Sequence, residues 1–192
     1  MRDNDLREAT HRKVLKKHHT EADTLVLDEL GVWTGSGRID IAVVNGKLHG
    51  FELKSAKDNL DRLEKQAEQY SSVFDHVTLV VADNHLVEAI ELVPDWWGVK
   101  KAVEGERGGI RITTERRDRK NPAVDPYRLA QLLWKDEVID ILDQLGGFRG
   151  FKSKPRKHLW ELLAANVELD QLRSMVRETL KSRTDWRAGS QQ

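Results

Sequence analysis

Residues 38–54 read RIDIAVVNGKLHGFELK, and this segment decides the fold. Apolar residues lie on both sides of Asn45-Gly46, a dipeptide typical of tight hairpin turns because both residues tolerate a positive φ. The segment therefore predicts two antiparallel strands, 38–44 and 47–54. Residues 24–32 form another apolar stretch that is typical of a strand, so we expect three antiparallel strands.

The next part of the chain indicates a crossover. Residues 56–74 carry apolar side chains at spacings of three and four, which is typical of a helix against a sheet. Residues 76–82 are a continuous apolar run and predict a buried strand, parallel to its neighbour. Residues 97–103 and 109–114 predict another hairpin, and the basic helix expected over 5–19 would cover one side of the sheet.

The character of the sequence changes near residue 120. Residues 129–145 and 157–182 are amphipathic and helical in pattern, with a basic loop between them. We therefore expect an α/β fold, a mixed four-to-five-stranded sheet flanked by helices, with a helical C-terminal extension. The predicted boundary separates a core of residues 1–120 from a helical subdomain of residues 121–192.

Composition limits the kinds of site that are available. The chain contains no cysteine, so disulfides and zinc–thiolate sites are excluded. A metal would be held by oxygen or histidine ligands, and oxygen ligands favour Mg²⁺ or Mn²⁺. No segment has the roughly 20 apolar residues needed to cross a bilayer, and no secretory leader is recognisable. We expect a cytoplasmic protein that does not bind membranes.

Charge is unevenly distributed although the net charge is zero. Residues 1–106 contain 14 basic and 20 acidic residues, and residues 107–192 contain 18 basic and 12 acidic residues. The basic half contains a loop that could bind phosphate groups, with a solvated loop as the alternative. Its candidate nucleic-acid-binding residues are Arg149, Lys152, Lys154, Arg156 and Lys157.

Three residues in the central hairpin have the chemistry of phosphodiester hydrolysis. This reaction requires an activated water, a cation that offsets negative charge, and a nearby positive group. Asp40 lies on one strand, and Glu52 and Lys54 follow on the next, where alternation places the last two on one face. Two carboxylates and one lysine therefore form a candidate catalytic group.

The register of this hairpin determines whether the carboxylates meet. A two-residue turn would pair Ile39 with Glu52 and leave Asp40 on the opposite face. One extra residue in the returning strand, at His49-Gly50, or an equivalent irregularity of the turn, would place Asp40 opposite Glu52. We then expect the apolar residues of both strands to pack together on the core side, namely Ile39, Ile41, Phe51 and Leu53.

These residues and their spacing resemble the PD-(D/E)XK, or restriction-endonuclease-like, nucleases, and within them a group of small bacterial and phage proteins. Ile39 stands where the motif has proline. The resemblance implies Mg²⁺ or Mn²⁺ bound by Asp40, Glu52 and the backbone carbonyl of Leu53, with Lys54 acting on the attacking water. It also implies an endonuclease with DNA as substrate.

The resemblance also suggests accessory positions. Many members of the superfamily have an upstream acidic residue, for which Glu29 is the preferred match and Glu8 or Glu21 are alternatives. Gln66 and Tyr70 share a helix face and resemble the Gln-x-x-x-Tyr motif of the RecB-like branch. On the alternative interpretation, Tyr70 is a core residue and Gln66 is its exposed neighbour.

Two other functions remain open. A nuclease fold that does not cut, or that cuts only with an unidentified protein partner, could bind DNA or protein in a phage or defence system. The complete Asp40, Glu52 and Lys54 set favours an enzyme over such a module. A junction resolvase is a third hypothesis and would require a symmetric homodimer.

Overall fold

The protein is built around one mixed β-sheet, as the computed structural model shows for residues 1–106 and 108–184. The six strands lie in chain order across the sheet. The β3–β4 and β4–β5 pairs are parallel, and the other three pairs are antiparallel. The strands are β1 (Leu25–Val32), β2 (Gly37–Val44), β3 (Leu48–Lys54), β4 (His76–Ala82), β5 (Gly98–Glu104) and β6 (Ile110–Arg116).

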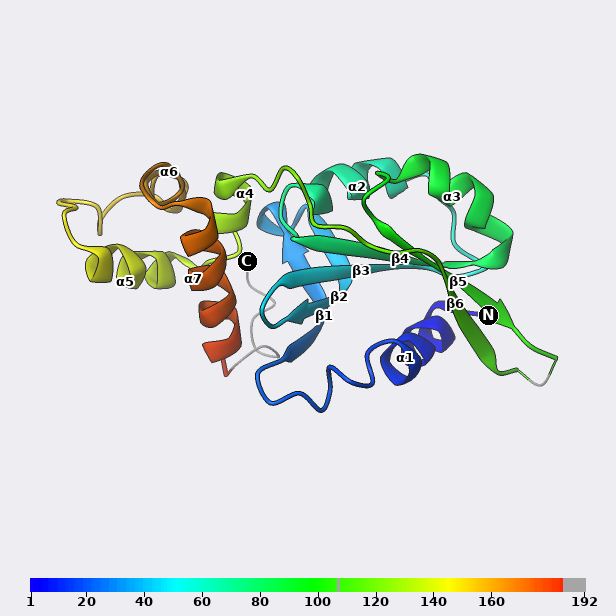
Figure 1. Ribbon diagram of the computed structural model, residues 1–192. Helices are drawn as coiled ribbons and strands as arrows, with labels where there is room; N and C mark the ends of the chain where they lie inside the picture. The colour runs from blue at the N-terminus through cyan, green and yellow to red at the C-terminus, as the bar shows by residue number, and fades with distance from the viewer. Residues whose placement is uncertain (107, 185–192) are drawn as a thin grey trace.

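Helices cover both faces of this sheet and extend beyond one end (Figure 1). α1 (Asp3–Lys13) lies on one face, and α2 (Leu63–Ser71) and α3 (Leu86–Leu92) lie on the other. Two 3₁₀ turns, Trp33–Gly35 and Asp83–His85, follow β1 and β4. None of the described helices is long and apolar enough to span a membrane. The C-terminal helices are α4 (Pro126–Ala130), α5 (Lys135–Leu145), α6 (Arg156–Asn166) and α7 (Leu169–Ser182).

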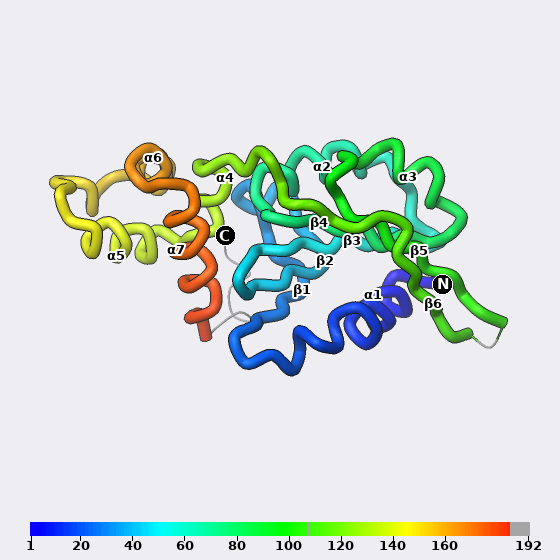
Figure 2. The backbone as a smooth tube through the Cα atoms, in the orientation of Figure 1, coloured from blue at the N-terminus to red at the C-terminus, as the bar shows by residue number. Residues whose placement is uncertain are grey.

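The expected α/β fold with flanking helices is confirmed, and the sheet has six strands rather than four or five. The crossover and the 98–116 hairpin are also confirmed. The backbone path in Figure 2 shows α5 and α6 farthest from the sheet. One hydrophobic cluster nevertheless joins sheet residues such as Val44 to C-terminal residues such as Leu159 and Leu172.

Several helices are shorter than predicted because local hydrogen bonds end them. The helix expected over 56–74 starts only at Leu63. Before it, the Asp58 side chain accepts a hydrogen bond from the Ser55 amide at 2.7 Å, and this bond stabilises a turn after β3. The region expected as one helix over 157–182 divides before Glu168, whose side chain accepts from the Asp170 amide and caps α7.

The turn between β2 and β3 contains three residues. Val44 pairs with Leu48, and the Asn45 side chain accepts a hydrogen bond from the Lys47 amide at 3.1 Å. Neither Asn45 nor Gly46 has a positive φ. The bulge expected at His49-Gly50 is therefore wrong, and the alternative, an irregular turn, is confirmed. Because of the added turn residue, Asp40 lies directly across from Glu52 in the register of β2 and β3.

Along β1 and along β2, the side chains stop alternating strictly between the two faces of the sheet at one pair of facing residues. Leu27 and Leu30 are three residues apart, as are Ile39 and Ala42, yet all four belong to the cluster beneath α2. The change occurs at Glu29, which has a φ of 60° and lies opposite Asp40 in the register. A non-glycine residue in this conformation costs roughly 1–2 kcal/mol, so the packing on either side must hold it there.

This phase change corrects one expectation about the core. Ile41, Phe51 and Leu53 pack together against α1, as predicted. Ile39 instead packs on the opposite face, where an added Cβ on Gly50 would lie 3.2 Å from its side chain. Gly50 therefore provides the space into which Ile39 fits when β2 changes phase.

We expect Gly50→Val to lower the free energy of unfolding by about 1–3 kcal/mol, because the new side chain would overlap Ile39 and Phe74 in a packed core. Urea denaturation provides the measurement. Gly46→Ala is the matched control, because a Cβ there meets no atom within 4 Å, and its effect should stay within about 0.5 kcal/mol. Equal stability of Gly50→Val and the parent protein would contradict this account of the phase change.

Candidate active site

A cleft of about 650 Å³ opens where β2 and β3 stop pairing. The last paired residues are Ile41 and Phe51, and beyond them the cleft lies between the two strands, α1 and the start of α2. All three predicted catalytic residues line it. Its charged and polar side chains are Asp3, Arg7, Glu29, Ser36, Arg38, Asp40, Glu52, Lys54, Asp58, Arg62, Lys65, Gln66, Gln69 and Tyr70.

Asp40 holds the two diverging strands together. Its Oδ2 accepts a hydrogen bond from the Leu53 amide at 2.8 Å, in the place of a backbone acceptor on β2. Its Oδ1 accepts from Arg7 Nη2 at 2.8 Å, and Arg7 Nη1 donates to the Asp40 carbonyl at 2.8 Å. The carboxylate is thus fixed from both sides, with Oδ1 directed into the cleft toward a positive charge.

Glu52 and Lys54 form a second, buried part of the site. Lys54 Nζ donates to Glu52 Oε1 at 2.8 Å and to Gln66 Oε1 at 2.9 Å. Gln66 Nε2 donates to the same Glu52 oxygen at 2.7 Å. Tyr70 is buried, donates to the Arg38 carbonyl at 2.6 Å, and accepts from Gln66 at 3.2 Å. Tyr70 is therefore a core residue that also orients Gln66.

The free oxygen of Glu52 suggests the position of a cation. Among the described residues, Glu52 Oε2 is buried and accepts no hydrogen bond. Burial, together with the nearby charge of Asp40, raises the pKa of Glu52 to about 8. Burial also raises the pKa of Asp40, although the Leu53 amide and Arg7 oppose this shift. Lys54 and Arg7 each already pair with one of these carboxyls, and a cation bound between the two would favour the ionised form of both.

The residues present fit a Mg²⁺ or Mn²⁺ ion. Such ions are held by one or two carboxylates and keep several water ligands. Within the described residues, no group of three or more carboxylate or histidine side chains has the arrangement of a complete metal cage. Asp40 and Glu52 are the two cleft carboxylates that lie on the paired strands β2 and β3, and the carbonyl of Leu53 as a third ligand stays a prediction.

Arg7 is a site residue that the sequence analysis missed. Its guanidinium donates to Glu29 Oε1 at 2.6 Å in addition to its bonds with Asp40, and Asp3 and Asp28 lie within 3.8 Å. Helical spacing places Asp3 and Arg7 on one face of α1, but no sequence pattern indicates which strand that face meets. Only the packing of α1 against Ile41, Phe51 and Leu53 brings Arg7 to Asp40.

Of the three acidic residues considered for an accessory role, one lies in the cleft and two lie outside it. Glu29 lines the cleft, and its positive φ turns it toward Arg7. Glu8 is exposed and lies 3.7 Å from Arg12 on its own helix. Glu21 is near His18 and Thr24, outside the cleft. The structure thus brings Glu29 to the predicted site and leaves Glu8 and Glu21 away from it.

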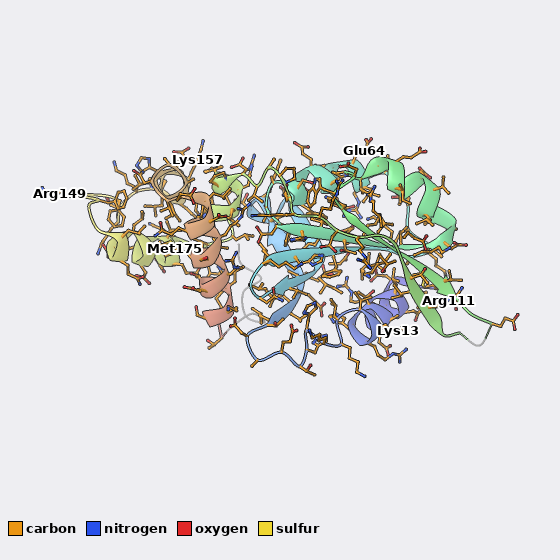
Figure 3. All side chains as sticks on the ribbon, in the orientation of Figure 1. Lys13, Glu64, Arg111, Arg149, Lys157 and Met175 are labelled. Carbon is orange, nitrogen blue, oxygen red and sulfur yellow. The ribbon has the colours of Figure 1, made fainter. Side chains whose placement is uncertain are left out.

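The basic loop does not reach this cleft. In Figure 3 Arg149 lies at the outer end of the C-terminal helices and Lys157 lies on α6, and none of the five predicted loop residues lines the cleft. Lys152 pairs with Asp143, and Arg156 stacks on Trp160. The cations that do line the cleft, besides Arg7 and Lys54, are Arg38, Arg62 and Lys65.

Comparison with known proteins identifies a phage family. The family model described as bacteriophage P4 protein cII matches residues 2–190. Protein cII of Enterobacteria phage P4 is 29% identical over 162 residues, which are 84% of this chain and 60% of that protein's length. A solved structure, SfsA of Pyrococcus furiosus in complex with Ca²⁺, covers 61% of this chain and 65% of that chain, with 13% identity and a TM-score of 0.38. This structural likeness is too low to support an argument. The family match spans nearly the whole sequence and confirms the expected relation to a phage protein, so this chain belongs to the bacteriophage P4 protein cII family.

Proposed function

We propose that this protein is a metal-dependent nuclease of the PD-(D/E)XK type that hydrolyses phosphodiester bonds, with DNA as its substrate. The observation that carries the proposal is the buried, unpartnered Glu52 Oε2 beside Asp40 and Lys54. A buried polar atom without a partner is costly, and a divalent cation would remove that cost. A charge pair that served only to stabilise the fold would have no reason to leave a carboxylate oxygen buried without a partner.

Each residue has a distinct role in the proposed reaction. Asp40 and Glu52 would hold Mg²⁺, which when bound supplies an acidic water and offsets charge on the phosphate. Lys54 holds its ammonium group beside Glu52 and is positioned by Gln66, so it can stabilise negative charge that develops on the phosphate. Arg38, Arg62 and Lys65 line the cleft and can contact the flanking phosphates.

We expect Lys54→Ala to lower the cleavage rate about 10²–10³-fold, because removing one preorganised positive donor has an effect of that size. The assay uses supercoiled, linear, single-stranded and branched DNA with Mg²⁺, Mn²⁺ or EDTA. Cutting of the circular form would show endonuclease activity. Lys57→Ala is the matched control, because Lys57 is exposed and does not line the cleft. Cleavage that survives EDTA or the loss of Lys54 would contradict the proposed mechanism.

We expect the affinity for Mn²⁺ to increase about tenfold per pH unit from pH 6 to pH 8 and then to level off. The reason is that the pKa of Glu52 is raised to about 8, so a cation must displace a proton below that pH. Isothermal titration calorimetry provides the measurement. Glu52→Gln and Asp40→Asn should each abolish binding, and a pH-independent affinity would show that the cation displaces no proton from Glu52.

The same raised pKa sets the pH dependence of stability without metal. The folded protein holds a proton on Glu52 that the unfolded chain releases above its ordinary pKa of 4.5, so stability falls as pH rises from about 4.5 to 8. We expect Glu52→Gln to be more stable than the parent in EDTA, by a margin that grows over this range. Urea denaturation at pH 5, 6, 7 and 8 tests the sign, and a constant margin would contradict it.

A second candidate function is a nuclease-fold module that binds DNA or protein without cutting, or that cuts only with a partner. The observation that favours it is Arg7, whose guanidinium lies on Asp40 Oδ1 and competes with a cation for that oxygen. Membership of a phage protein family is also compatible with such a module. On this hypothesis α1 keeps the site closed to metal until a partner moves it.

We expect Arg7→Ala to bind Mn²⁺ at least tenfold more tightly than the parent protein if Arg7 competes with the cation. A gain in DNA cleavage together with tighter binding would support a partner-activated enzyme. Tighter binding of Mn²⁺ with no cleavage by either protein would support the non-cutting module. Unchanged affinity would exclude competition at Asp40, and Arg12→Ala on the exposed side of α1 is the control.

A further inference from the structure

A second cleft, of about 320 Å³, lies at the opposite end of β3 from the candidate active site. Four separate parts of the chain line it: the β2–β3 turn, the start of β4, the segment after β6, and one side of α7. The two clefts share no lining residue. The charged and titratable residues around it are Lys47, Asp75, His76, Lys120, Asp170, Arg173 and Arg177.

Asp75 is the structural centre of this cleft. Its Oδ2 accepts from the Leu48 amide at 2.8 Å, and Arg173 Nε lies 2.9 Å from its Oδ1. Arg177 Nη1 lies 3.7 Å from the same carboxylate. Asp75 is buried, so its charge is used to attach α7 to the sheet and to direct two arginines into the cleft.

The remaining cations of this cleft have weak partners. Lys47 Nζ is 3.9 Å from its carboxylate partner on Asp118. Within the described residues the Lys120 side chain forms no hydrogen bond and no ion pair within 4 Å, and its charge interacts with that of Asp170 across the cleft. Arg177 donates to the Ser174 hydroxyl at 3.0 Å, and Asp170 is paired with Arg173 at 2.6 Å. Four permanent cations therefore surround the cleft with two carboxylates, and both carboxylates are already engaged.

This surplus of donors points to a ligand with several anionic oxygens. Arginine binds phosphate through its planar set of N–H groups, and lysine binds it as a point charge. We propose that the second cleft is a phosphate-binding site for the backbone of DNA. The choice of DNA as the source of phosphate rests on the proposed function.

The spacing of the two clefts fits a single nucleic-acid ligand. Lys47 lies in the turn just before β3 and Lys54 ends that strand, so they are seven residues apart, which at the rise of an extended chain corresponds to about 23 Å. Successive phosphates along one strand of a duplex advance about 3.4 Å each along the axis, so this separation corresponds to about seven base pairs. Contacts at both ends of β3 would fix the direction of the duplex while the first cleft receives the reacting bond.

The test uses the exposed lysines, because neither holds the fold together. We expect the double variant Lys47→Ala/Lys120→Ala to bind a fluorescein-labelled 20-base-pair duplex about tenfold more weakly than the parent, measured by anisotropy in EDTA. The slope of log affinity against log salt should fall by about 2, since each phosphate contact contributes about 0.9. The matched control is Lys16→Ala/Lys17→Ala, which removes two exposed lysines that line neither cleft.

The outcomes separate this inference from the proposed function. No DNA binding by the parent protein would overturn both. DNA binding that the Lys47→Ala/Lys120→Ala variant retains with an unchanged salt slope would overturn the second site alone. A third outcome is that inorganic phosphate binds the parent but not this variant, while the two proteins bind DNA with equal affinity. The cleft would then bind free phosphate, and the inference that it binds the DNA backbone would be wrong. Arg177→Ala provides an independent variant, with a thermal melt to establish that it is folded.

Discussion

The hydrogen bond from the Leu53 amide to Asp40 Oδ2 connects the fold of this protein to its candidate chemistry. Beyond Ile41 and Phe51 the backbones of β2 and β3 no longer pair, and an unsatisfied amide in a buried sheet would be costly. A side-chain carboxylate satisfies that amide. The same arrangement places Asp40 at the mouth of a cleft, with Glu52 on the next strand, so the break in the sheet is also the site.

The buried carboxyl and the strained backbone of the site lower the stability of the folded protein, and packing elsewhere in the fold must offset this loss. Glu52 is nearly fully buried, one of its oxygens has no hydrogen-bond partner, and Glu29 has a positive φ. Two extensive clusters hold this region in place, one on the α1 face and one on the α2 face of the sheet. Functional sites often combine perturbed carboxyls with strained backbone in this way, because a ligand can relieve what packing alone maintains.

Opposite roles of arginine distinguish the two ends of β3. At the first cleft Arg7 supplies the positive charge that Asp40 requires without metal, and it is surrounded by acidic residues. At the second cleft a single buried carboxylate, Asp75, holds Arg173 and Arg177, and the positive charge is in excess. A cluster of carboxylates suits a cation and an excess of basic groups suits a phosphate, so the two ends of β3 differ in the charge of the ligand that they favour.

The sequence by itself determined the strands, the central hairpin, the crossover and the candidate set of Asp40, Glu52 and Lys54, because these depend on local alternation and on residues close together in the chain. It also limited any metal to oxygen or histidine ligands, since cysteine is absent. The tertiary structure decided the three-residue turn, the placement of Ile39 over Gly50, and the entry of Arg7 into the site. It also showed that the basic loop lies away from the cleft. These features depend on which faces meet across the sheet, and residues far apart in the chain carry no local pattern that specifies that contact.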